Sequence, residues 1–137
     1  MIEFTIPGKP TPQQRHRDIK GGRGKYDPCK AEKQLFLMKS LEYAPKKPFD
    51  FPIKLDVKFF LPRPKTHYET KKNIKGLLKS NAPKWHINRP DKDNLLKFVK
   101  DALNGVFWKD DSVVCDGRET KQYSSNPRIE ITISECN

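Results

Sequence analysis

The segment IKLDVKFFL, residues 53–61, decides the fold. Its apolar side chains recur at every second position, and Lys54, Asp56 and Lys58 occupy the positions between them. A period of two is typical of a β-strand that has one face in the core and the other towards solvent. No other stretch of the chain predicts a strand as strongly.

The chain before this strand predicts a shorter strand, a loop and a helix. Residues 2–6 alternate apolar and polar side chains, which predicts a short half-buried strand. Residues 7–28 carry four prolines, four glycines and several cations, with too little apolar content to pack, and we expect a loop. Residues 31–43 place leucines and a methionine at helical spacing, and Pro45 ends this predicted helix.

The chain after the central strand opens with a second basic loop, residues 62–89. Residues 91–104 then predict the strongest helix, because their apolar side chains form one face and Gly105 follows as a stop. Strands are predicted near residues 113–123 and 128–134. The order β-α-β-α-β-β predicts an α+β fold, with a small mixed sheet packed by two helices.

Length and composition limit the class of protein. A chain of 137 residues fits a single domain, so we expect residues 1–137 to form one. No apolar run approaches the roughly 18 residues of a membrane span, and no signal peptide opens the sequence. The three cysteines are an odd number without a C-x-x-C pair, which favours reduced thiols. We therefore expect a cytoplasmic protein without a membrane partner.

The charge points to a polyanionic partner. The chain has 28 Lys and Arg against 17 Asp and Glu, which gives a net charge of +11. Such a charge raises the rate of encounter with phosphate backbones, although charge alone decides little. The cations predicted to bind DNA lie in the two basic loops and just before the second helix: Arg15, Arg17, Lys20, Arg23, Lys25, Lys65, Lys84 and Arg89.

Acidic residues gather around the start of the second helix. Pro90 disfavours a helical conformation for the residue before it, so the helix begins at or just after Asp91, with Asp93 in its first turn. Lys97 lies one turn after Asp93 on the same side. If the strand after residues 110–111 runs beside the helix start, one of those two aspartates can meet Asp91 and Asp93.

Three carboxylates close together on a cationic protein require a physical reason. Without a counter-ion they repel one another, and at least one would bind a proton. Mg²⁺ removes this conflict because it takes oxygen ligands and keeps several waters. The ion can also bind a phosphodiester oxygen and lower the pKa of a bound water, while Lys97 holds the phosphate. The reaction class suggested is metal-assisted phosphodiester hydrolysis.

Each of these residues also has a common structural role. An aspartate at a helix start is more often a cap than a ligand, and paired aspartates often form a turn. A lysine and an aspartate four residues apart, as in Lys97 and Asp101, usually form a weak surface ion pair. Taken together within 21 residues of a basic chain, the acidic residues nonetheless favour a metal site.

The same residues carry a family resemblance. RPDKDNLLK (residues 89–97), DALNG (101–105) and WKDD (108–111) resemble the RusA family of Holliday-junction resolvases, whose pattern is P-D-x-D-N-L-x-K, D-A-L-N-G and W-x-D-D. A dozen positions match in order with their spacing kept. The early segments PGKP (7–10) and RHR (15–17) and the order of elements resemble the family more loosely.

The resemblance implies roles for individual residues. Asp91, Asp93 and Asp111 would be the catalytic acids that bind the metal, Lys97 would be an essential catalytic lysine, and Asp110 ranks below Asp111. The family implies a homodimer that binds four-way junction DNA and nicks two strands of like polarity symmetrically with Mg²⁺. A two-fold dimer suits this reaction, because paired cuts need two identical active sites.

Two other functions stay open from the sequence. A non-catalytic nucleic-acid binding module would use the charge and the basic loops but has no need of clustered acids. A general nuclease that acts on flaps or single strands would use the same metal chemistry. Competition among junction, flap and linear duplex substrates separates it from a junction resolvase.

Overall fold

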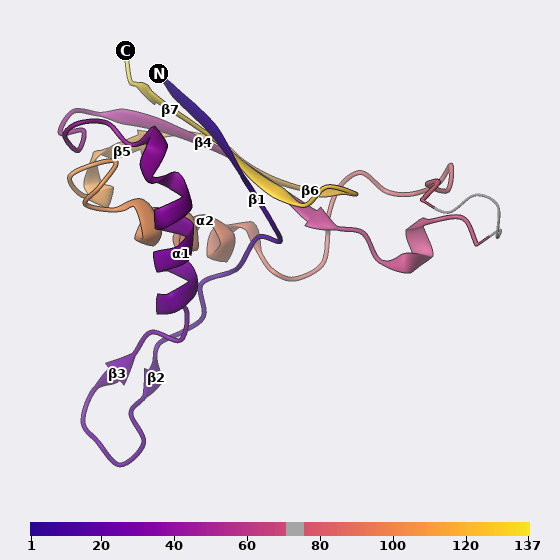
Figure 1. Cartoon of the computed structure of the whole chain (residues 1–137), viewed down its shortest axis with the longest axis horizontal. Helices are drawn as coiled ribbons and strands as arrows, with labels where there is room; N and C mark the ends of the chain where they lie inside the picture. The colour runs from indigo at the N-terminus through magenta and orange to yellow at the C-terminus, as the bar shows by residue number, and fades with distance from the viewer. Residues whose placement is uncertain (71–75) are drawn as a thin grey trace.

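The computed structural model describes residues 1–70 and 76–137 (Figure 1). In this part of the chain the main sheet has five strands, and its fold is α+β as predicted. Strands β1, β7 and β4 lie side by side and antiparallel, and both β5 and β6 pair parallel with the far side of β4. The bounds of the strands are Ile2–Pro7 (β1), Ile53–Pro62 (β4), Val114–Asp116 (β5), Glu119–Ser124 (β6) and Arg128–Glu135 (β7).

Strand β4 is central, and its alternation is the one the sequence predicts. The side chains of Ile53, Leu55, Val57, Phe59 and Leu61 are buried in the core. The positions between them face the other side of the sheet. The core therefore lies against one face of the sheet only.

Helices α1 (Lys30–Ser40) and α2 (Lys92–Leu103) cover that face, with the short 3₁₀ helix η1 (Leu41–Tyr43) after α1 (Figure 1). Phe36 of α1 meets Phe98 of α2 edge to face, with ring centroids 5.8 Å apart. The predicted apolar face of the second helix is confirmed, since all its members are buried: Leu95, Phe98, Val99, Ala102 and Leu103. In the described residues no helix is long and apolar enough to cross a bilayer.

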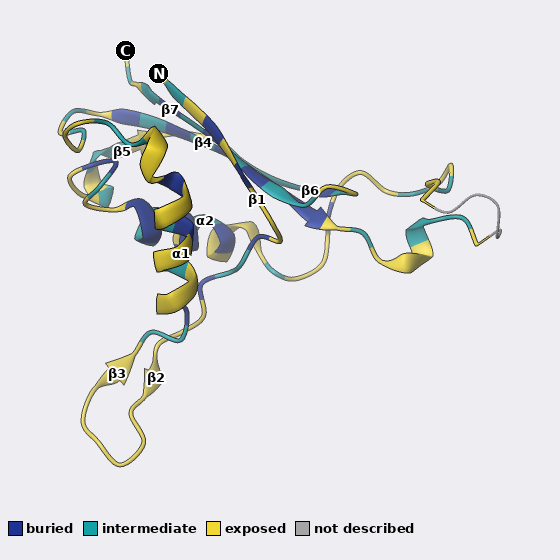
Figure 2. Ribbon diagram, viewed as in Figure 1, coloured by how far each residue is buried: buried dark blue, intermediate teal, exposed yellow. Residues whose placement is uncertain are grey.

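The loop predicted over residues 7–28 contains a small hairpin, which corrects that prediction. Strands β2 (Arg17–Asp18) and β3 (Lys25–Tyr26) pair antiparallel and project from the body of the molecule (Figure 1). Figure 2 shows the hairpin exposed along its whole length. Because these strands bury no side chain, they leave no apolar alternation in the sequence.

The strand predicted over residues 113–123 is interrupted, and a 3₁₀ helix, η3 (Asp111–Val113), precedes it. Gly117 separates β5 from β6 and has a φ of +146°. A Cβ atom at Gly117 would lie 1.8 Å from the carbonyl oxygen of Leu55, so this close approach to β4 requires glycine. Arg118 N–H then donates to Oδ1 of Asp56 at 2.9 Å, and β6 pairs with β4 from Glu119 onward.

The second basic loop forms an arm, residues 63–84, that leaves β4 and returns to β6 (Figure 1). Residues 71–75 of this arm lie outside the described part. It contains the 3₁₀ helix η2 (Lys65–His67) and, at its base, Nη1 of Arg63 donates to the carbonyl of Pro83 at 2.6 Å. The ring of Tyr123 packs against His67 at 4.7 Å between centroids, which fastens the arm to β6.

Candidate active site

The start of α2 lies at Asp91, as predicted. The carbonyl of Asp91 accepts the helical hydrogen bond from Leu95 N–H at 3.2 Å, while its own backbone is extended, as expected of an N-cap residue. The Asp91 carboxylate makes no capping hydrogen bond within residues 1–70 and 76–137. Asp91 and Asp93 are both exposed, so their carboxylates face solvent at the positive end of the helix dipole.

A pocket of about 320 Å³ lies along the outer face of α2. Asp93, Lys97 and Asp111 line it together. Asp93 and Lys97 belong to α2, whereas Asp111 is the first residue of η3. Asp101 also lines the pocket, and its carboxylate lies 3.6 Å from Nζ of Lys33 on α1. The expected surface pair of Lys97 with Asp101 is therefore wrong, because α1 supplies a different partner.

Asp91 is not among the residues that line this pocket. Among the described residues, no three His, Cys, Asp or Glu side chains are grouped closely enough to hold a metal ion. The structure thus brings Asp93, Lys97 and Asp111 to one pocket and leaves Asp91 beside it, two residues before Asp93. The assignment of the three aspartates as metal ligands stays a prediction.

A buried core residue holds the carboxylate of Asp111 by a hydrogen bond. The indole Nε1–H of Trp108 donates to Oδ1 of Asp111 at 2.9 Å, and the Trp108 side chain is completely buried. This hydrogen bond uses Oδ1 and leaves Oδ2 for another ligand. Trp108 belongs to the WKDD motif, and its three-residue spacing from Asp111 is the signal that could have revealed the contact.

Asp110 serves the local turn instead. Its Oδ2 accepts a hydrogen bond from Ser112 N–H at 3.1 Å, which caps η3. Hydrogen bonding from Ser112 lowers the pKa of the Asp110 carboxyl below its usual value. Of the two neighbouring aspartates, Asp111 alone lines the pocket.

Lys121 of β6 fixes the segment that leads into α2. Its Nζ donates to the carbonyl oxygens of Asn88 at 2.5 Å and Pro90 at 2.9 Å, and lies 3.2 Å from Nδ1 of His86. Burial, and then the charge of Lys121, lowers the pKa of His86. A neutral His86 accepts a hydrogen bond from the lysine at Nδ1. No local pattern in the sequence indicates this lysine, because its partners lie 31 to 35 residues away.

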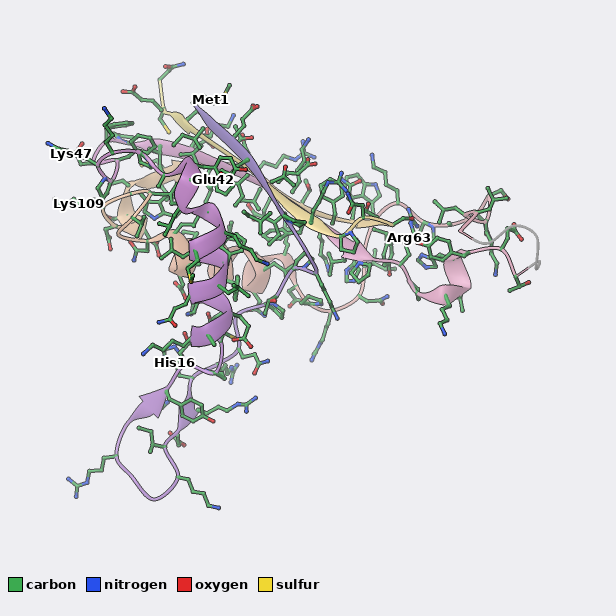
Figure 3. All side chains as sticks on the ribbon, viewed as in Figure 1. Met1, His16, Glu42, Lys47, Arg63 and Lys109 are labelled. Atoms are coloured by element: carbon green, nitrogen blue, oxygen red, sulfur yellow. The ribbon has the colours of Figure 1, made fainter. Side chains whose placement is uncertain are left out.

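The predicted DNA-binding cations are all exposed and fall into three groups. Five lie on or beside the hairpin, two belong to the arm, and Arg89 lies two residues before Asp91. In Figure 3, His16 marks the base of the hairpin and Arg63 the base of the arm. The five at the hairpin are Arg15, Arg17, Lys20, Arg23 and Lys25, and the two of the arm are Lys65 and Lys84.

Comparisons with known proteins show the family to which the chain belongs. The family model described as Endodeoxyribonuclease RusA matches residues 7–134. An uncharacterized protein, YqaN of Bacillus subtilis (strain 168), is 38% identical over 142 residues, which cover 98% of this chain and 96% of that protein. A protein of Lactococcus phage r1t named crossover junction endodeoxyribonuclease rusA is 31% identical, with 98% of this chain and 96% of the phage protein covered. With the family model matched along nearly the whole chain, this nuclease belongs to the RusA endodeoxyribonuclease family.

Proposed function

We propose that this protein is a Mg²⁺-dependent endonuclease that resolves four-way DNA junctions by symmetric, paired nicking of phosphodiester bonds. The observation that carries the proposal is the pocket shared by Asp93, Lys97 and Asp111 on a chain of charge +11. A basic binding module has no use for carboxylates placed where phosphates approach. The name of the phage relative supports the junction as substrate.

The donor atoms suit a hard divalent cation. Asp91, Asp93 and Asp111 offer carboxylate oxygens, which Mg²⁺ prefers, and Oδ2 of Asp111 is not used by Trp108. When bound, Mg²⁺ supplies a Lewis acid and lowers the pKa of a coordinated water. Asp91 and Asp93 are held at the helix start, where the segment bound by Lys121 enters α2.

The remaining groups position the DNA. Lys97 lines the pocket with the acids and pairs with the scissile phosphate as negative charge develops on it. The hairpin and the arm carry cations away from the body, so they can contact phosphates on separate parts of a branched substrate. Residues 1–137 act as one domain, and two copies related by a two-fold axis supply the paired active sites. Because the proposed substrate is DNA, we expect the enzyme to act in the cytoplasm.

The test is cleavage of a synthetic mobile four-way junction with and without Mg²⁺. Wild-type protein gives paired nicks in strands of like polarity only with the metal. Asp91→Asn, Asp93→Asn and Asp111→Asn each bind the junction but lose cleavage. Glu42→Gln, an exposed acid on η1, is the control that removes one negative charge elsewhere and keeps normal activity.

Three results would contradict the proposal. Normal cleavage by the Asp91→Asn and Asp93→Asn variants would show that the acids are not catalytic. Equal cleavage of flap, linear duplex and junction in direct competition would show a general nuclease rather than a resolvase. Junction binding without any metal-dependent product would show that the protein is a non-catalytic binding module.

A further inference from the structure

A hollow of about 620 Å³ lies on the face of the main sheet that the helices leave uncovered. The positions of β4 between its core residues point to this face, and so do Thr120 and Gln122 of β6, which pair in register with Lys58 and Phe60. Thr132 of β7 continues the floor, and the returning end of the arm forms one side. The residues that carry the inference are Lys54, Lys58, Lys84, Trp85, Arg118 and Gln122, and we name them the Trp85 surface.

The hollow is cationic. Lys54, Lys58, Lys84 and Arg118 line it, against the two carboxylates of Asp56 and Asp116. Both carboxylates are already engaged by backbone donors. Oδ1 of Asp56 accepts from Arg118 N–H at 2.9 Å, and Oδ1 of Asp116 accepts from Gly117 N–H at 2.8 Å. Nζ of Lys54 also lies 3.9 Å from Oδ2 of Asp56. Four cations against two acids still leave a net positive surface that suits phosphates.

Trp85 is the aromatic group of this surface. Its backbone forms a β-bridge with Gln122 at the outer edge of β6, and the neighbouring Lys84 carbonyl accepts from Tyr123 N–H at 2.8 Å. The Trp85 side chain is nevertheless 50% exposed, and Nζ of Lys84 lies 4.9 Å from the ring centroid. A half-exposed ring on a fixed backbone costs little conformational entropy when it stacks on a planar ligand.

We infer that the Trp85 surface binds unpaired nucleotides of a DNA strand. A base stacks on the indole of Trp85, while Lys54, Lys58 and Arg118 contact the phosphates on either side. Aromatic rings within a basic groove are the usual means by which proteins hold single strands, because every base has a π-face. A paired duplex keeps its bases stacked inside, so it offers Trp85 nothing to stack on. The Trp85 surface shares no residue with the pocket of Asp93, Lys97 and Asp111, although Trp85 and Arg118 also line another pocket with Lys92 at the start of α2.

The experiment measures binding of oligo(dT) in EDTA, where no metal-dependent cleavage occurs. Trp85 is half exposed and Trp108 is completely buried, so added oligo(dT) quenches the fluorescence of Trp85 selectively. In parallel, the anisotropy of a labelled oligo(dT) gives the dissociation constant. We expect Trp85→Ala to weaken binding by about tenfold or more, and Trp85→Phe to bind within about threefold of wild type.

Matched variants separate stacking from charge. Lys58→Ala on the Trp85 surface weakens oligo(dT) binding, whereas Lys39→Ala on α1, which covers the opposite face, leaves it unchanged. Circular dichroism melting confirms that each variant folds. Unchanged affinity in folded Trp85→Ala overturns the inference. An equal loss of affinity for linear duplex also overturns it, because the surface would then recognise phosphates without bases.

The result is independent of the cleavage assay. A protein that binds oligo(dT) through Trp85 but cuts no junction would retain this inference and lose the proposed function. If the wild-type protein cuts junctions normally but Trp85→Ala binds oligo(dT) with unchanged affinity, the proposed function is retained and this inference is lost.

Discussion

The buried indole of Trp108 donates to Oδ1 of Asp111 at 2.9 Å, so the core of the protein sets the orientation of an acid in the pocket. Such a partner behind a metal ligand limits its rotation and fixes which oxygen faces the ion. Phe107, its neighbour, is equally buried but makes no hydrogen bond of this kind through its apolar ring. The two residues therefore allow packing and orientation to be tested separately.

We expect Trp108→Phe to lower junction cleavage by about tenfold to a hundredfold and to raise the Mg²⁺ concentration needed for half-maximal rate. Junction affinity in EDTA stays unchanged. Phe107→Leu is the control, because it also shrinks the core and lowers the melting temperature but leaves the hydrogen bond to Asp111 intact. Equal cleavage by the two variants, at equal stability, would show that Trp108 acts by packing alone.

Lys121 of β6 holds the segment that leads into α2. Replacing it by methionine keeps the aliphatic length but removes the donors to Asn88 and Pro90, so the segment before Asp91 is no longer fixed. We expect Lys121→Met to lower the cleavage rate at saturating junction by about tenfold. Lys121→Arg restores part of the rate because it retains donors.

The measurement is single-turnover cleavage of the junction, with binding followed in EDTA. A purely structural role would lower the melting temperature and leave the rate of the folded protein unchanged in Lys121→Met. That result would remove Lys121 from the residues that position the acids.

The hairpin is predicted to bind DNA through charge. Arg17→Ala removes an exposed guanidinium at the start of β2, and we expect it to weaken junction binding more than it slows cleavage of bound DNA. The slope of log affinity against log salt should fall by about one for each phosphate that the variant no longer neutralises. Lys47→Ala, an exposed lysine between η1 and β4, is the control (Figure 3). Identical salt slopes for wild type and Arg17→Ala would exclude this role for the residue.

Asp27 makes stability depend on acid pH. Burial raises the pKa of its carboxyl, but hydrogen bonds from Lys33, Cys29 N–H and Gln13 outweigh burial and lower the pKa from 3.8 to about 2. The ionised group therefore stabilises the fold above about pH 4, and this contribution is lost as the pH falls from about 4 to about 2.

We expect Asp27→Asn to reduce the difference in unfolding free energy between pH 5 and pH 2 by at most about 2 kcal/mol. Urea denaturation at both pH values measures it. The Glu42→Gln variant, whose carboxyl is exposed, is the matched control. A difference that is the same in Asp27→Asn and wild type would show that Asp27 does not carry the acid sensitivity.

The parts of the fold predicted from sequence are those with a strong apolar period. Strand β4 and helix α2 each turn one face to the core, so their apolar side chains recur with the period of a strand and of a helix, respectively. The hairpin strands β2 and β3 bury nothing and leave no such trace. The break at Gly117 depends on the approach of the Leu55 carbonyl from another strand, which no local pattern encodes.

The site divides in the same way. Asp91, Asp93 and Lys97 are predictable as neighbours because they belong to one helix. The residues alone leave Asp110 and Asp111 as alternatives, and only the family resemblance ranks Asp111 first. Lys121 and the donor role of Trp108 are not, since each depends on which side chain reaches a partner through the fold. The pocket itself is only partly predictable, because Asp91 lies beside it rather than in its wall.

The return of the arm along β6 has a consequence for solubility. Tyr123 N–H on the outer side of β6 donates to Lys84, and the Lys121 carbonyl accepts from His86 N–H at 3.4 Å. These bonds occupy a strand edge that would otherwise recruit strands from neighbouring molecules. A shortened arm that no longer reaches this edge would leave it exposed to edge-to-edge aggregation, whatever its effect on DNA.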